Sequence, residues 1–528
     1  MFLSSGAVRV FATATALAVS AWIPGTPEGA AQDGGVLRVN TQLVLVDVVV
    51  RNRDRAVENL TADDFRLLDN GVPQTLAVFE TVAGAPDPDS AATLPAGVAT
   101  NRRNSGGSIQ TSATAILIDR LNTPTDAQVF INQRLPEFLE SFGQLEGLAI
   151  YELGDEFRVL HDFTEDPANL LEVARGLQPE HSLALASSDS GGGFEADLGT
   201  VGLDRGIAEE FRLSDSGFAR RGSDYFLNER ALKTSVALET IVRHMEGLEG
   251  RKNLVWLSGR FPFAFDARRR SDLADEVETR TLQQMESVGV SIAEANVAIY
   301  PVDVRGPGGE GAEVGGISEH IADRTGGRSF RTNGVDTAIQ AAVTDAQMVY
   351  RLGFYPSEVT TDGGFRNLTI EVSGDDLQVR YRPGYFGFAG GSQPTPRVGL
   401  VELLSSPLDA TSIGLTALAV PAPDATGVYQ VMTVVDAHDL GLVPVGGRRL
   451  GVVDVGMAFR SDDDGTVFVL PMESRSVNLT DAQFQEAEAG FVIQKVIDTE
   501  GRTGSLRIVI QDQSTGAAGS VWIPAGQE

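Results

Sequence analysis

Oxygen-bearing side chains follow three short apolar runs of this sequence, each at a point where a buried strand would end. They are Asp119, Asn122, Thr123, Ser258 and Asp303. Carboxylate, amide and hydroxyl oxygens are hard donors of the kind that Mg²⁺ and Ca²⁺ prefer. Side chains of these types could hold a divalent cation. The alternative is that Asp119 and Thr123 only cap the turn through hydrogen bonds and that no metal binds.

Alternating apolar and amphipathic segments would place these side chains on one sheet. Continuous apolar runs at 115–118, 254–257 and 297–302 are typical of strands that are buried on both faces. Strands separated by helices pair in parallel through right-handed crossovers, and their carboxyl ends meet at one edge. The predicted fold class is therefore α/β, with a doubly wound, mostly parallel, Rossmann-like sheet, flanked by domains of the β-sandwich type.

The segment from Asp119 to Thr123 also carries a family resemblance. It resembles the first metal motif of the von Willebrand factor A (VWA) domain. In that family an Asp-x-Ser-x-Ser motif, a distant Thr and a distant Asp build a metal-ion-dependent adhesion site (MIDAS), which leaves one metal position open for a carboxylate of a protein partner. Asp119 matches the first aspartate and Thr123 the second hydroxyl, whereas Leu121 replaces the first serine.

The other positions of the motif are degenerate. Ser258 stands where the resemblance implies the second aspartate, and Ser223 is a candidate for the distant Thr. Asn122 can offer a carbonyl oxygen, and Asp303 can replace the missing carboxylate. The resemblance thus implies a degenerate MIDAS that holds Mg²⁺ or Ca²⁺, or no metal at all.

An ordered set of segments is similar to a narrower family, the exported VWA-related proteins typical of Acidobacteria. The segments are 44–50 with 60–65, 121–124, 250–259, 299–306 and 381–386. This resemblance implies the VWA fold and export. It implies no established reaction or partner.

Composition shifts along the chain predict the domain boundaries. We expect a signal peptide at 1–31, a β-rich unit at 36–82, a linker at 83–112, the VWA-like domain at 113–349 with an insertion at 178–224, a second β-rich unit at 350–388, a linker at 389–397 and a β-sandwich-like domain at 398–528. The VWA-like domain stands between two β-rich units, which is an insertion geometry. We therefore expect 36–82 and 350–388 to pair into one domain.

The N-terminus and the charge constrain location and partners. Arg9, an uncharged run at 10–23 and a small-residue site at 29–31 predict a cleaved signal peptide, and hence a periplasmic or secreted protein. No later segment is long and apolar enough to span a membrane. The net charge of −30 argues against nucleic acid as a partner, and the lack of cysteine excludes disulfides and thiolate sites.

These observations favour a binding protein over an enzyme. The sequence contains no HExxH, no phosphate loop and no GxSxG motif. The leading hypothesis is an exported adhesion-type module that binds a protein partner with the carboxyl edge of the sheet. The alternatives are an envelope scaffold without metal and, less favoured, a divalent-metal hydrolase using Asp119 and Asp303. The leading hypothesis requires Asp119 to lie beside Ser258 and Asp303 and to be accessible.

Overall fold

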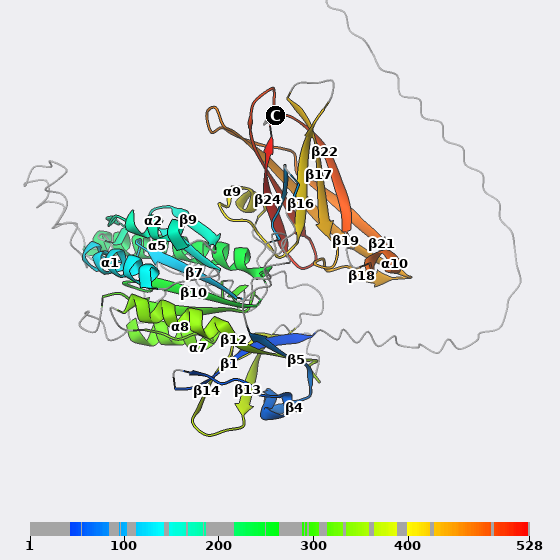
Figure 1. The fold of residues 1–528 in the computed structure, drawn as a ribbon. Helices are drawn as coiled ribbons and strands as arrows, with labels where there is room; N and C mark the ends of the chain where they lie inside the picture. Colours follow the sequence, from blue (N-terminus) through cyan, green and yellow to red (C-terminus); the bar gives the residue numbers. More distant parts are fainter. Residues whose placement is uncertain are drawn as a thin grey trace, which may run out of the picture. The chain divides into compact units, whose positions relative to one another are not determined.

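The structure is a computed structural model, shown in Figure 1. It describes residues 43–83 (except 54), 94–102 (except 96), 112–141, 147–182 (except 165–166), 184–185, 216–262 (except 249), 288–305 (except 290 and 293–294), 314–357 (except 331–333), 364–387 and 399–525 (except 423–426 and 487–489). The expected signal peptide at 1–31 and the linker at 389–397 lie outside the described residues. No helix in the described part of the chain has the length and apolar character needed to cross a membrane.

A five-stranded sheet forms the centre of the α/β domain. Its strands are β7 (Ser112–Asp119), β8 (Leu148–Leu153), β9 (Phe157–Thr164), β10 (Arg251–Ser258) and β11 (Val297–Asp303). They lie in the order β11-β10-β7-β8-β9, and all neighbours are parallel except the antiparallel pair β8 and β9. A parallel bridge from Val302 to Phe330 extends the β11 edge. The mixed α/β class predicted from the sequence is therefore confirmed.

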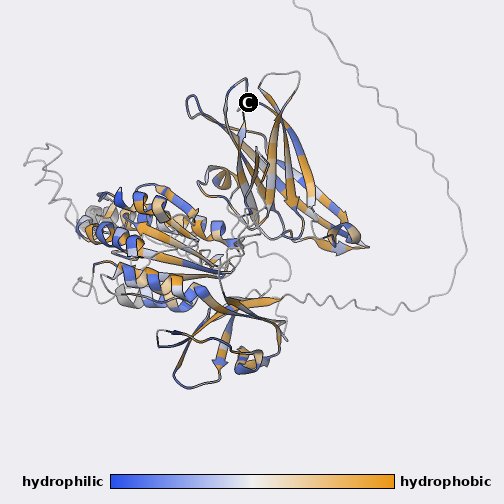
Figure 2. Cartoon of the chain, viewed as in Figure 1, coloured by the Kyte–Doolittle hydropathy of each residue, from blue (hydrophilic) through white to orange (hydrophobic). Residues whose placement is uncertain are grey.

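Helices supply the apolar residues that cover both faces of this sheet. They are α1 (Thr125–Ser141), α2 (Pro167–Arg175), α5 (Ser216–Glu246), α7 (Val314–Thr325) and α8 (Val335–Gln347). Leu117 of β7 shares one core with Leu238 of α5, and its neighbour Ile116 shares the other core with Ile131 of α1 and Ile339 of α8. Because side chains alternate along a strand, a strand covered on both faces must be apolar throughout. Figure 2 shows this contrast between hydrophobic strands and helices of mixed character.

The β-rich segments on either side of the α/β domain share their sheets. The first segment contains β1 (Val44–Asn52), β2 (Arg55–Ala56), a 3₁₀ turn at Ala62–Asp64, β3 (Phe65–Asp69), β4 (Val72–Gln74) and β5 (Leu76–Ala83). The second contains β12 (Met348–Phe354), β13 (Phe365–Val372), β14 (Leu377–Arg380) and β15 (Gly384–Phe386). Strand β12 lies between β1 and β5, and β3 pairs with β13. The α/β domain is thus inserted in the chain between two halves of one β unit.

The C-terminal part of the chain is β-rich. Its elements are α9 (Leu400–Ser405), β16 (Leu415–Pro421), β17 (Val428–Asp436), β18 (Val443–Val445), β19 (Arg448–Ser461), β20 (Val467–Val469), β21 (Glu473–Thr480), α10 (Asp481–Phe484), β22 (Gly490–Asp498), β23 (Gly504–Asp512) and β24 (Ala518–Ala525). The strands form one sheet around β16, β17 and β22 and another around β19, β23 and β24. Val431 of the first sheet and Ile508 of the second belong to one core, as in a β-sandwich.

The elements of the structure differ from the expected boundaries at three places. The stretch 83–112, expected to be a linker, contains the strand β6 (Val98–Thr100), which pairs with β16 of the C-terminal domain. A strand of three residues is too short to show a period, so the sequence pattern could not reveal it. Helix α5 begins at Ser216, inside the expected insertion 178–224, and β12 begins at Met348, directly after α8.

Candidate functional site

The strand register brings three of the predicted site residues to neighbouring strand ends. Ser258 is the register partner of both Asp119 and Asp303, because β10 lies between β7 and β11. Asn122 and Thr123 stand in the turn that connects β7 to α1. Asp119, Ser258 and Asp303 therefore lie at one edge of the sheet, and Asn122 and Thr123 follow directly after the β7 end of that edge.

The carboxylate of Asp119 is buried and surrounded by hydrogen-bond donors. Its side chain has no exposed surface. It accepts hydrogen bonds from the backbone N–H and Nδ2 of Asn122 (both at 3.0 Å to Oδ1), from Nε1 of Trp256 (3.0 Å) and from Oγ of Ser258 (2.9 Å). Burial raises the pKa of Asp119, while the bonds from Asn122, Trp256 and Ser258 oppose that rise. The accessibility that the adhesion hypothesis required of Asp119 is therefore absent, which corrects that expectation.

Thr123 ties the turn after β7 to the turn after β10. Its hydroxyl donates to the backbone oxygen of Asp119 and accepts the backbone N–H of Gly259 at 2.8 Å. A Cβ atom at Gly259 would lie 2.8 Å from Cδ of Pro124, so only glycine allows the two turns to approach this closely. Thr123 thus connects the turn after β7 to the turn after β10 through hydrogen bonds.

Asn122 connects the turn to helix α5. Its Oδ1 accepts from Nε of Arg230 at 2.9 Å, and its Nδ2 donates to Oγ1 of Thr234 at 2.9 Å. Arg230 and Thr234 are both buried. The carbonyl oxygen that the sequence analysis offered to a metal is therefore occupied by the guanidinium of Arg230.

Sequence reasoning missed both of these α5 residues. It named Ser223 for the distant hydroxyl; Ser223 belongs to α5, but its side chain lies outside the described residues. The sequence does contain a signal for these two residues. Arg230 and Thr234 stand four residues apart, and they continue toward the N-terminus of the helix the buried stripe that contains Leu238 and Ile241. Polar residues on an otherwise apolar helical stripe indicate a buried polar partner.

The side chain of Asp303 contacts Arg305, two residues further along the chain. Its carboxylate accepts from the backbone N–H of Arg305 (3.1 Å) and forms an ion pair with the Arg305 guanidinium (3.0 Å). The strand ends are nevertheless joined there, because the N–H of Val304 donates to the backbone oxygen of Ser258 at 3.1 Å. Asp303 is adjacent to the Asp119 network, but it does not supply that network with a second carboxylate in place of the missing aspartate.

The donor set around Asp119 does not fit a resident cation. Mg²⁺ and Ca²⁺ need several oxygen lone pairs directed at one point, whereas both Asp119 oxygens face N–H or O–H donors. Within the described residues, no group of three or more His, Asp or Glu side chains is placed to hold a metal ion. A cation at Asp119 would have to displace these donors, and metal binding there stays a prediction from the sequence.

A second polar network supports the same turn from the other side. Arg120 is buried and pairs with Glu152, and its NH1 donates to Oε1 of Gln128 at 2.9 Å. Nε2 of Gln128 donates in turn to the backbone oxygens of Thr123 and Glu180, both at 2.8 Å. The turn after β7 is therefore held on both sides by buried side chains.

Comparison with solved structures returns matches of low similarity. A von Willebrand factor type A protein from Catenulispora acidiphila matches with 10% identity over 86% of this chain and 74% of its own, at a TM-score of 0.22. Proximal thread matrix protein 1 of the mussel byssus, solved with a zinc-occupied MIDAS motif, matches with 12% identity over 47% of this chain, at a TM-score of 0.22. This chain spans 49% of the length of that mussel protein.

A hypothetical protein from Pyrococcus horikoshii OT3 matches with 9% identity over 20% of this chain and 85% of its own, at a TM-score of 0.14. No family model and no curated protein matches the sequence. At these TM-scores the matches assign no function to this chain.

Proposed function

We propose that this chain is an exported protein-binding module, rather than an enzyme, built on a doubly wound α/β domain of the VWA type. We call its proposed contact surface the strand-end lip, which consists of residues 119–126, 258–262 and 303–305. Support comes from the bonds that tie the three turns together, from Gly259 to Thr123 and from Val304 to Ser258. Loops fixed in this way lose little conformational entropy when a partner binds.

The binding contacts would come from side chains around Asp119 and not from Asp119 itself. Thr125 and Asp126 are exposed, and Arg260 and Arg305 are partly exposed, on the strand-end lip. They present both signs of charge beside a buried and rigid base. The Asp119 network would then act as an internal brace that keeps the lip in one shape.

A charge-reversal experiment tests this proposal. The mature chain, Asp126→Lys combined with Arg260→Glu, and the control Arg134→Glu on an exposed part of α1 would each be used to recover proteins from envelope extract. We expect a protein that the wild type and Arg134→Glu retain and that the double variant loses. Equal recovery by all three would contradict the lip as a contact surface and would favour the envelope-scaffold alternative.

Export is proposed from residues 1–31, whose pattern is that of a signal peptide. We expect protein recovered from the periplasm or the medium to begin at Gln32, as measured by mass spectrometry of the intact chain. Cytoplasmic protein that retains residues 1–31 would contradict this part of the proposal.

A further inference from the structure

A short segment between the N-terminal β unit and the α/β domain completes the C-terminal domain. Strand β6 pairs with β16 through three register pairs, Thr100 with Thr416, Ala99 with Ala417 and Val98 with Leu418. Ala99 packs against the core of the C-terminal domain, and β6 also lies against β24. Three ladder pairs alone are a weak attachment, so the residues after the strand are decisive.

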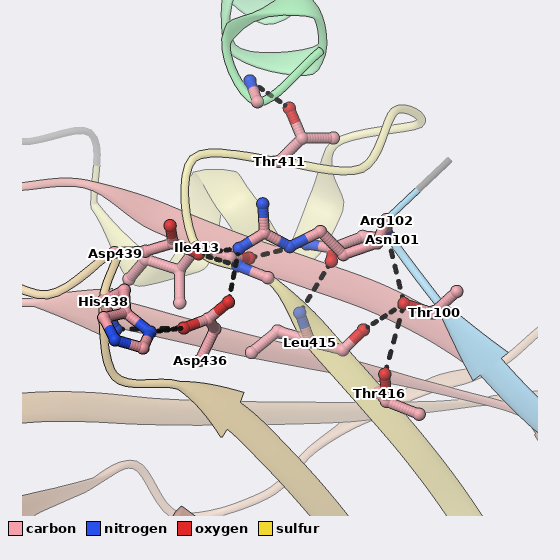
Figure 3. Close-up of polar contacts among 12 residues, drawn as sticks. Thr100, Asn101, Arg102, Thr411, Ile413, Leu415, Thr416, Asp436, His438 and Asp439 are labelled. Carbon is pink, nitrogen blue, oxygen red and sulfur yellow. Dashed lines mark hydrogen bonds and ion pairs between the residues drawn. The ribbon is translucent and has the colours of Figure 1, made fainter. Parts of the chain in front are cut away.

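Asn101 is the first of these residues, and it is buried. Its Nδ2 donates to the backbone oxygens of Ala410 and Ile413, both at 2.8 Å, and its Oδ1 accepts the N–H of Leu415 at 2.7 Å (Figure 3). One side chain thereby satisfies three backbone groups of the C-terminal domain. An ionised aspartate side chain cannot donate a hydrogen bond, and a leucine side chain can neither donate nor accept one. The arrangement therefore selects a side-chain amide such as that of asparagine.

Arg102 is the second, and it lies on a complementary surface. Its NH2 pairs with Oδ2 of Asp436 at 2.8 Å and also with Asp439 (Figure 3). The guanidinium lies directly against Gly414, where an added Cβ would be only 2.1 Å from Nε of Arg102. Burial raises the pKa of Asp439, and the charge of Arg102 opposes that rise. The carboxylates of Asp436 and Asp439, together with Gly414, thus form a negatively charged seat for a guanidinium.

We propose that these features form a peptide-recognition site, which we call the β16 acceptor site and which consists of the β16 edge, the backbone groups that bind Asn101, and the seat of Gly414, Asp436 and Asp439. The chain fills this site with its own residues 97–102, and the same segment of a second copy can fill it in trans. The ligand class is an extended peptide in which a small residue faces the core, one further residue follows, and Asn-Arg comes next, as in Ala99-Thr100-Asn101-Arg102. Recognition combines strand addition with two side-chain pockets.

Residues 97–102 of the same chain occupy the β16 acceptor site in preference to a free peptide. Because it is covalently linked to the domain, its effective concentration is high, and a free peptide competes poorly with it. The β16 acceptor site lies in the C-terminal domain and does not depend on the strand-end lip. Failure of either proposal therefore leaves the other unaffected.

The direct test uses the full mature chain with residues 97–102 replaced by a Gly-Ser stretch of equal length. A fluorescent peptide of residues 94–103 is titrated against it and against the wild type, with anisotropy as the readout. We expect the replaced chain to bind the peptide at least about tenfold more tightly than the wild type does. A peptide carrying Asn101→Ala should bind about 100-fold more weakly, because three buried backbone groups lose their partner. No binding, or equal binding of the two peptides, would overturn the proposal.

A second measurement covers the case in which the replaced chain does not fold. Protease-recognition sequences are placed within 84–93 and 103–111 of the otherwise native chain, which is folded, cut at both sites and passed through gel filtration. We expect the excised fragment to co-elute with the rest of the protein, and the same fragment with Asn101→Ala to separate from it. Separation of the native fragment would overturn the proposal, since a recognition site must retain its ligand without a covalent tether.

Discussion

Replacing Asp119 with alanine removes one acceptor that serves donors from three residues, Asn122 in the turn after β7 and Trp256 and Ser258 on β10. Two of these donors keep another partner, because Oγ of Ser258 lies 2.6 Å from the backbone oxygen of Arg260 and Nδ2 of Asn122 lies 2.9 Å from Oγ1 of Thr234. Nε1 of Trp256 and the backbone N–H of Asn122 each donate to an Asp119 oxygen at 3.0 Å. The variant therefore removes that acceptor from two buried N–H groups.

The expected destabilisation follows from that count. Removing the acceptor of a buried donor costs about 1–3 kcal/mol, so the loss at these two donors costs about 2–6 kcal/mol. The loss of a buried carboxylate offsets part of this cost, since burial raises the pKa of Asp119. We expect a net decrease in the free energy of unfolding of about 2–4 kcal/mol, a large part of the total of about 5–15 kcal/mol that is typical of a folded protein.

The pH dependence has a definite sign. Because the pKa of Asp119 is raised above 3.8, the folded protein holds this proton more tightly than the unfolded chain does. The stability that Asp119 contributes is fully present below pH 3.8 and decreases as the pH rises through the folded-state pKa. The deficit of Asp119→Ala relative to the wild type should therefore be larger at pH 4 than at pH 7.

Urea unfolding followed by near-ultraviolet circular dichroism measures this deficit, since Trp256 loses a hydrogen bond and reports on the site. Ser258→Ala is the matched control: it removes one donor and leaves the carboxylate with the others, so we expect a loss below about 1 kcal/mol. Equal losses for Asp119→Ala and Ser258→Ala, or a deficit that grows from pH 4 to pH 7, would refute the description of Asp119 as the buried acceptor of this network.

Three further predictions concern other groups. Gly259→Ala should lower the stability by about 1–3 kcal/mol, because its Cβ would lie 2.8 Å from Pro124; an unchanged melting temperature would show that the two turns can separate without cost. Lys252 is buried, and burial lowers its pKa from 10.5 to about 8, so its deprotonation favours the folded state. Between pH 8 and pH 10.5 the wild type should gain stability relative to Lys252→Met, by up to about 3 kcal/mol, and a constant difference in urea unfolding would contradict this. Calorimetric titration of the mature chain with Mg²⁺, Ca²⁺ or Mn²⁺ should show no saturable heat that Asp119→Asn abolishes; such a heat would support the metal site predicted from the sequence.

Much of the α/β domain could be predicted because its pattern is local. The runs 115–118, 254–257 and 297–302 are apolar at every position, which a strand covered on both faces requires. The polar residues that end them could be assigned to a single edge, because parallel strands end on the same side of a sheet. Asp119, Ser258 and Asp303 do lie at adjacent strand ends.

The chemistry of that edge could not be predicted in the same way. Whether an aspartate holds a cation or accepts hydrogen bonds depends on which atoms surround it. Asp119 receives donors from Trp256 and Ser258, 137 and 139 residues away, and Arg230 approaches Asn122 across 108 residues. Residue types and spacing within one motif do not encode these distances.

The sequence by itself determined the identity of the buried strands, the interruption of a β unit by the α/β domain, and the positions where polar side chains follow apolar runs. Only the tertiary structure decided that Asp119 is enclosed, that Arg230 faces the amide of Asn122, and that residues 98–100 join a sheet whose other strands begin more than 300 residues later. The physical reason is the separation along the chain of the residues that determine each property. Hydrophobic periodicity is a property of neighbouring residues, whereas burial and hydrogen-bond partners depend on contacts between segments that the chain brings together only when it folds.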